Sequence, residues 1–157
     1  MVVAVVGFPL GANLSGTKAE ETRAVIGEGA DEVDMVISLG AIKSREFRTA
    51  FDDMRAVVEA AGPVPVKVIL ETALLDEYQK VLSCILAERA GAAFVKTSTG
   101  FASGGATAED VVLMRRVVGE RVAVKAAGGI RDFQTARAMV DAGADRLGCS
   151  ASVAIVT

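Results

Sequence analysis

Three lysines lie in three successive short apolar segments of the chain, where a charged side chain is expensive to bury. Lys67 falls within Val66–Leu70, Lys96 ends Phe94–Lys96, and Lys125 ends Val122–Lys125. A charge in a buried strand must be paired or functional. On neighbouring parallel strands, about 4.8 Å apart, two ammonium groups disfavour each other's charge, and burial acts in the same direction. We therefore expect at least one lysine with a lowered pKa.

An uncharged lysine amine can attack a carbonyl and form a Schiff base. The resulting iminium withdraws electrons while an adjacent carbon–carbon bond forms or breaks. Asp34, in the apolar segment Glu32–Ile37, could then move protons or hold a water. The alternative is structural, with the strand lysines paired to Asp34 and Glu71 in salt bridges. Residue types alone leave both interpretations open.

The residue types that the chain lacks narrow the possible chemistry. It has no histidine, which excludes catalytic triads with a histidine base and histidine metal ligands. Two cysteines, Cys84 and Cys149, are too few for a disulfide framework or a zinc cluster, and no metal site is expected. Cys84 lies in an apolar helical segment and is expected to be a buried thiol in a cytoplasmic protein.

Charge and hydropathy argue against nucleic acid and membrane as partners. The net charge of −3 argues against a nucleic-acid-binding protein. The apolar segment Met1–Leu10 is too short to span a membrane and has no basic start, so it reads better as a buried strand than as a signal peptide.

The 157 residues, 52% of them hydrophobic, predict a single globular domain over residues 1–157. Short β-branched segments alternate with longer helical patterns, as in a parallel sheet covered by helices. The expected strands are Val2–Val6, Glu32–Ile37, Val66–Leu70, Phe94–Lys96, Val122–Lys125 and Arg146–Gly148. Their regular spacing predicts a repeated strand–helix unit.

Helix starts and ends support this repeat. Thr17 with Glu20 resembles a capping box, and Ser44, Asp76, Thr107 and Asp132 are expected N-caps. Gly29, Gly91 and Gly143 each stand where a helix should end and a strand begin.

Such a repeat forms either an open doubly wound sheet or a (β/α)8 barrel. No G-x-G-x-x-G motif follows the first expected strand, which disfavours a dinucleotide-binding sheet. Charged residues within the strands favour the barrel, because its interior can bring them together. Six strands are two fewer than a barrel needs, so we predict an incomplete barrel of the (β/α)8 type.

Glycine-rich segments after the last two expected strands predict a phosphate site. Gly128-Gly129 and Gly148-Cys149-Ser150 offer backbone N–H groups without shielding side chains. Barrel enzymes commonly bind phosphate in these two loops. Ser103–Thr107 could form a further wall or a lid, and Arg131 could contact phosphate. The alternative is that these glycines only form tight turns.

Several segments together resemble the class I 2-deoxyribose-5-phosphate aldolase family. The most specific are Val95-Lys96-Thr97-Ser98-Thr99-Gly100 and Val124-Lys125-Ala126-Ala127-Gly128-Gly129-Ile130-Arg131. Matching segments also occur, in family order, at 5–11, 31–37, 67–72 and 146–150.

The resemblance implies a cofactor-free, reversible cleavage of 2-deoxy-D-ribose 5-phosphate to acetaldehyde and D-glyceraldehyde 3-phosphate. By resemblance, Lys96 is the Schiff-base lysine, Lys125 the lysine that perturbs its pKa, and Asp34 the proton relay. The implied substrate-binding residues are Lys67, Thr97, Gly128, Gly129, Gly148 and Ser150. The implied partners are sugar-phosphate and short aldehyde substrates, with neither nucleic acid nor membrane.

The sequence departs from the family pattern in length and at two positions. The match begins at the family's third strand, so an N-terminally truncated barrel is expected, and the chain stops early in the last helix. Phe101 stands where some members have a phosphate-binding lysine, and Ala151 replaces a serine of some phosphate sites. Exposed sheet edges would favour a homo-oligomer.

Two other functions remain open at this point. One is a different Schiff-base barrel enzyme, such as transaldolase. The other is an inactive or partner-dependent barrel fragment that only binds sugar phosphate or associates with other chains.

Overall fold

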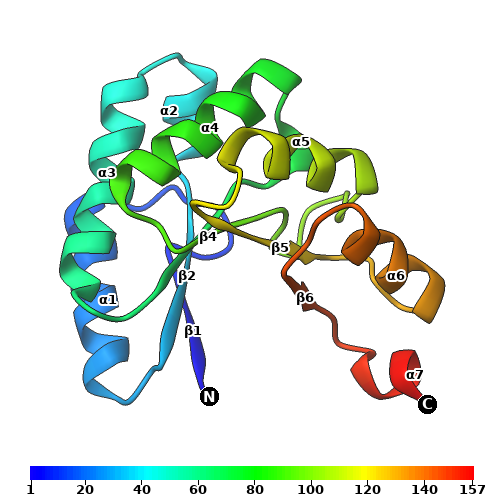
Figure 1. Ribbon diagram of the computed structural model, residues 1–157. Coiled ribbons are helices and arrows are strands. Elements are labelled where there is room, and N and C mark those ends of the chain that lie inside the picture. Colours follow the sequence, from blue (N-terminus) through cyan, green and yellow to red (C-terminus); the bar gives the residue numbers. More distant parts are fainter.

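The computed structural model describes residues 1–157 as six parallel strands that alternate with helices along the chain (Figure 1). The strands are β1 (Val3–Val6), β2 (Glu32–Val36), β3 (Val66–Ile69), β4 (Phe94–Lys96), β5 (Ala123–Ala127) and β6 (Arg146–Gly148). The helices are α1 (Ser15–Gly27), α2 (Leu39–Lys43), α3 (Phe47–Ala61), α4 (Glu77–Ala90), α5 (Ala108–Val118), α6 (Phe133–Asp141) and α7 (Ser152–Val156), with a 3-10 turn at Thr72–Leu74.

The strands lie in the sheet in chain order, from β1 to β6, and every neighbouring pair is parallel. Helices α1, α3, α4, α5 and α6 follow one another around the outside of the sheet, each packed against the next (Figure 1). This is a half-barrel, as predicted. A doubly wound sheet reverses its strand order part-way, and so carries helices on both faces. The sequential order of these strands therefore excludes that alternative.

Strand alternation separates an apolar outer face of the sheet from a charged inner face. Outward residues such as Val33, Val68, Val95 and Val124 are fully buried beneath the helices, with Met54, Cys84 and Met114 among the helical residues of the core. Cys84 is buried as predicted, and burial raises the pKa of its thiol to about 12. The outer face therefore supplies the hydrophobic core, and the inner face is left for polar groups.

Three predicted helix caps are confirmed. Asp76 and Gln79 form a full capping box at α4, while Thr107 and Asp132 accept hydrogen bonds from the backbone N–H groups of Asp110 and Thr135. Gly91 ends α4 with a φ of +93°, the left-handed conformation expected there.

The predicted caps at Thr17 and Ser44 are wrong. Thr17 lies inside α1, whose first turn is fixed instead by contacts with α3, including a 2.9 Å hydrogen bond from Ser15 to Asp53. Ser44 follows the short helix α2, which the sequence analysis did not predict, and α3 begins only at Phe47. The first error arises where contacts between helices set the boundary, and the second where the additional helix α2 ends at Ser44.

Strands β1 and β6 form the two edges of the sheet and each pairs on one side only. Val3 and Val5 of β1 lie on the inner, concave face of the sheet, and their surfaces are 36% and 42% exposed. None of the helices is both long and apolar enough to span a bilayer.

Candidate active site

The charged residues of the inner face meet at one carboxylate. Asp34 of β2 accepts hydrogen bonds from Lys67 of β3 at 2.8 Å, Lys96 of β4 at 2.8 Å and Lys125 of β5 at 2.9 Å. Lys96 and Lys125 share the same oxygen, Oδ2, and lie directly opposite each other in the sheet. The salt bridges of the structural alternative are thus present in part, since all three lysines pair with Asp34, whereas Glu71 forms no ion pair with any of them.

A second carboxylate extends this network toward the amino-terminal end of the strands. Glu32 of β2 lies 2.6 Å from Lys67 Nζ and accepts a 2.6 Å hydrogen bond from Arg146 of β6. Burial, the largest single influence, acts to raise the pKa of Glu32, but the contacts with Lys67 and Arg146 together lower it. Glu32 is therefore a carboxylate held in its ionised form between two cations.

The inner face of the sheet carries four cations and two carboxylates, and this excess of positive charge shifts the pKa values of Asp34 and Lys125. Burial opposes ionisation of Asp34, but the three ammonium groups outweigh it and lower the pKa of Asp34 to about 2. Burial lowers the pKa of Lys125, and the charges of Lys96 and Lys67 lower it further, against the opposing effect of Asp34. The expectation of a lysine with a lowered pKa is thus met at Lys125.

A cavity of about 440 Å³ opens above these lysines at the carboxyl ends of the strands. Six of the predicted site residues line it: Lys96, Lys125, Gly128, Gly129, Gly148 and Ser150. Asp34 and Lys67 do not line the cavity, and only 2% and 0% of their surface is exposed. Thr97 is also fully buried, and its hydroxyl donates to the Ala127 carbonyl at 3.0 Å.

Glycines shape the cavity at the two loops where a phosphate site is predicted. Gly128 and Gly129 have φ angles of +92° and +78°, which only glycine adopts readily. Gly148 leaves room for Lys125, because a Cβ there would lie 3.2 Å from Lys125 Cε. Gly148 therefore does more than form a turn, because it leaves space for the Lys125 side chain.

The sequence analysis missed several residues that belong to this region. Glu32 faces the inner side of the sheet because it lies two residues before Asp34 on the same strand, and Arg146 does so because it lies directly opposite Lys125. The two-residue period of a strand could have revealed both positions. Thr99 and Phe101 line the cavity through the loop after β4, which has no such period. Arg131, considered for phosphate contact, also lines it.

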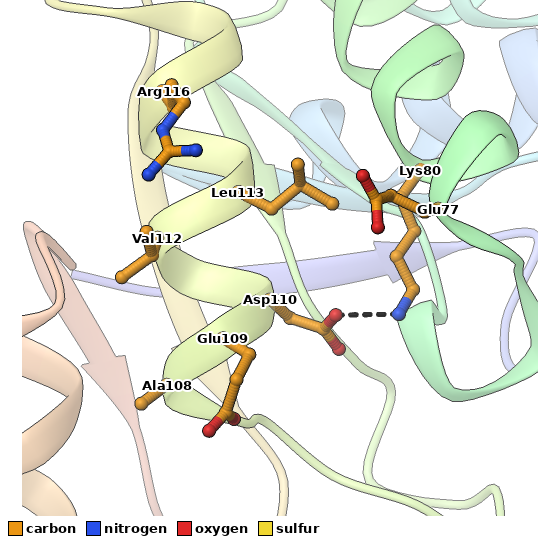
Figure 2. Close-up of a pocket in the computed structure, with 8 residues that line it drawn as sticks. All are labelled: Glu77, Lys80, Ala108, Glu109, Asp110, Val112, Leu113 and Arg116. Carbon is orange, nitrogen blue, oxygen red and sulfur yellow. Dashed lines mark hydrogen bonds and ion pairs between the residues drawn. The ribbon is translucent and has the colours of Figure 1, made fainter.

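Another hollow, of about 530 Å³, lies in the outer layer between α4 and α5 (Figure 2). Its charged groups include Lys80 and Asp110, which pair at 2.6 Å, together with Glu77, Glu109 and Arg116. None of the strand lysines lines this hollow. The convergent lysines Lys96 and Lys125 line the cavity on the inner side of the sheet instead.

Comparison with known proteins assigns this arrangement to a family. The model of the DeoC/LacD family aldolases matches residues 2–155. The chain belongs to this aldolase family. The deoxyribose-phosphate aldolase of Brevibacillus brevis is 56% identical over 156 residues, covering 99% of this chain and 71% of that protein. The Streptococcus sanguinis enzyme is 58% identical over 151 residues, covering 96% and 69% of the two chains.

Solved structures show the same aldolase fold. An aldolase designated QR15 superposes with a TM-score of 0.94 at 40% identity, over 98% of this chain and 70% of that one. A tetrameric deoxyribose phosphate aldolase from Aeropyrum pernix gives a TM-score of 0.89 at 35% identity, over 98% and 65%. The chain thus spans about 70% of the length of its curated relatives, and its six strands match part of their barrel.

Proposed function

We propose that this aldolase-family chain catalyses the reversible cleavage of 2-deoxy-D-ribose 5-phosphate to acetaldehyde and D-glyceraldehyde 3-phosphate. The observation that carries the proposal is the sharing of Asp34 Oδ2 by Lys96 and Lys125, at the floor of a cavity with a glycine-rich rim. Relatives that are 56% and 58% identical are deoxyribose-phosphate aldolases, which supports this substrate.

In the first step, the Lys96 amine attacks C1 of the open-chain sugar phosphate. A proton leaving Lys96 can pass to the free amine of Lys125, whose pKa is lowered, because both lysine nitrogens contact the same Asp34 oxygen. The carbinolamine then loses water and becomes an iminium. The low pKa of Asp34 keeps a negative charge beside the iminium as it forms.

In the second step, the bond between C2 and C3 breaks. A base takes the proton of the C3 hydroxyl, C3 becomes the aldehyde of glyceraldehyde 3-phosphate, and the bonding electrons move to the iminium as an enamine. Lys125, whose pKa is lowered by burial, is suited to act as this base in its free-amine form. Protonation of the enamine at C2 and hydrolysis of the iminium then release acetaldehyde and free Lys96.

The phosphate would occupy the glycine-rich side of the cavity. Gly128, Gly129, Gly148 and Ser150 line that side, with Arg131 beside them. Backbone N–H groups of glycine-rich turns bind phosphate well because no side chain prevents close approach. This orientation directs C1 of the sugar toward the lysines.

Borohydride trapping tests the proposal directly. The protein is incubated with 2-deoxyribose 5-phosphate and sodium borohydride, and the adduct is located by intact mass and peptide mapping. We expect one adduct, on Lys96, and its loss in Lys96→Arg. Lys43, an exposed lysine that does not line the cavity, provides the matched control, because Lys43→Arg should leave trapping unchanged.

Absence of an adduct from folded protein, beside a full-length aldolase that traps normally, would contradict the proposal. Stabilisation by the sugar phosphate without product would instead favour the fragment that only binds it. We also propose self-association through the two open sheet edges, so trapping and light scattering should be compared at several protein concentrations. A monomer at every concentration would contradict that part.

A further inference from the structure

Glu71 is a buried carboxylate at the end of β3 without a cationic partner. Only 2% of its surface is exposed, and no lysine or arginine nitrogen lies within 4.0 Å of it. Its backbone adopts a φ of +56°, a left-handed conformation that is strained for a residue with a side chain. Both features are unfavourable by themselves, and such features persist where the surrounding structure requires them.

The carboxylate is held by a single residue of the loop after β4. The backbone N–H of Thr99 donates to Glu71 Oε2 at 3.2 Å, and the Thr99 hydroxyl donates to the same oxygen. The Thr99 hydroxyl oxygen in turn accepts a 3.1 Å hydrogen bond from the Phe101 N–H. Glu71 therefore fixes both Thr99 and the start of the segment that follows.

This loop is fixed at its other end as well. The Ala106 N–H donates to the Gly128 carbonyl at 2.9 Å, and a Cβ on Gly105 would lie 2.4 Å from that carbonyl oxygen. Between the two ends, the Phe101 ring meets the Phe8 ring edge-on, with centroids 5.3 Å apart. The loop from Thr99 to Ala106 thus runs from Glu71 to the predicted phosphate loop.

Two residues of this loop face the candidate active site. Thr99 and Phe101 line the same cavity as Lys96 and Lys125. A substrate joined to Lys96 by C1 and held by its phosphate near Gly128 must pass beside them. A small aldehyde joined to Lys96 would not extend that far.

We propose that Glu71 is a positioning residue, which holds Thr99 and Phe101 against the cavity so that they contact the sugar carbons of a phosphorylated aldose bound to Lys96. The inference rests on the proposed function for its substrate. Glu71 does not touch the substrate itself, and it acts through the two donors of Thr99. Removing its carboxylate should weaken binding of a long substrate while leaving the amine chemistry of Lys96 intact.

The test compares borohydride trapping of two aldehydes in matched variants. Glu71→Ala removes both acceptor oxygens, Glu71→Gln keeps one, and Thr99→Val removes only the hydroxyl. Glu28→Gln, an exposed glutamate in another part of the chain, is the control. Acetaldehyde reports the reactivity of Lys96, and 2-deoxyribose 5-phosphate reports the reactivity together with the loop contacts.

We expect the concentration of sugar phosphate that gives half-maximal trapping to rise about tenfold in Glu71→Ala, as for loss of one charge-assisted hydrogen bond. Thr99→Val should behave similarly, Glu71→Gln should recover part of the loss, and acetaldehyde trapping should stay within about twofold in all variants. Equal losses for both aldehydes would overturn the proposal, because they indicate general damage. Unchanged half-saturation in Glu71→Ala would also overturn it.

Hydrogen exchange without substrate separates this inference from the proposed function. Peptides covering residues 99–106 should exchange faster in Glu71→Ala than in wild-type protein, and equal exchange would overturn the positioning role. If the wild-type protein traps neither aldehyde, the proposed function fails, and the exchange result then decides whether Glu71 holds the loop.

Discussion

Arg146 of β6 donates a 2.6 Å hydrogen bond to Glu32 of β2, although β3, β4 and β5 lie between these strands in the sheet. The contact crosses the concave side, so the sheet must curve strongly enough to bring its second and sixth strands within side-chain reach. Arg146 also lies over the Phe94 ring, 4.8 Å from its centroid. Through Glu32 and Lys67, this contact joins β6 to the network around Asp34.

Removing Arg146 should destabilise the protein. Arg146→Met replaces the charged guanidinium with an apolar side chain, and leaves Glu32 buried with Lys67 as its only cation. Because Arg146 is itself one third exposed, we expect a loss of about 1–2 kcal/mol in the free energy of unfolding, less than for a fully buried pair. Urea unfolding measures this. Arg137→Met, which breaks an exposed pair with Asp141, should have little effect, and equal losses in both variants would contradict the prediction.

Acid should remove the stabilisation that comes from Asp34. Its pKa is lowered from 3.8 to about 2 in the folded protein, so its contribution is present above about pH 4 and lost as the pH falls toward 2. A shift of this size corresponds to about 2 kcal/mol. Asp34→Asn lacks this contribution, so the difference in unfolding free energy between wild type and variant should narrow by about that amount between about pH 6 and pH 2.

Urea unfolding at several pH values measures this difference. Asp52→Asn, which changes an exposed aspartate paired with Arg48, should follow the wild-type pH dependence. Parallel curves for wild type and Asp34→Asn would show that Asp34 is not held as an ion by the three lysines.

A methyl group at position 148 should disturb Lys125. In Gly148→Ala the new Cβ would lie 3.0 Å from the Ala127 Cβ and 3.2 Å from Lys125 Cε, closer than ordinary contact. We expect Lys125 to move away from Asp34 and the rate of borohydride trapping to fall about tenfold or more, with a stability loss of about 1 kcal/mol. Gly16→Ala, which meets no atom within 4 Å in α1, should trap at the wild-type rate. Wild-type trapping by Gly148→Ala would contradict the prediction.

Thr107 and Thr17 both look like helix N-caps in the sequence, but they should differ in their contribution to the free energy of unfolding. Thr107→Ala removes the acceptor for the Asp110 N–H at the start of α5 and should cost about 1 kcal/mol. Thr17→Ala changes an exposed residue inside α1 and should be neutral or slightly stabilising. Thermal or urea unfolding distinguishes them, and a larger loss at Thr17 would contradict the structure.

Most of the fold could be predicted from the sequence because its signals are local. Continuous β-branched segments, capping residues such as Asp76 and glycines such as Gly91 act within a few residues of the chain. They located all six strands and three helix caps. The prediction failed at Thr17 and Ser44, where contacts between α1 and α3 and the added helix α2 set the boundaries.

The sequence by itself determined which side chains could do chemistry, since lysines in otherwise apolar strands are costly unless they are used or paired. Only the tertiary structure decided which groups meet. The register and curvature of the sheet bring three lysines to Asp34, join Arg146 to Glu32, and leave Glu71 to Thr99. These contacts join residues 28 to 114 positions apart, a separation at which local sequence patterns carry no signal.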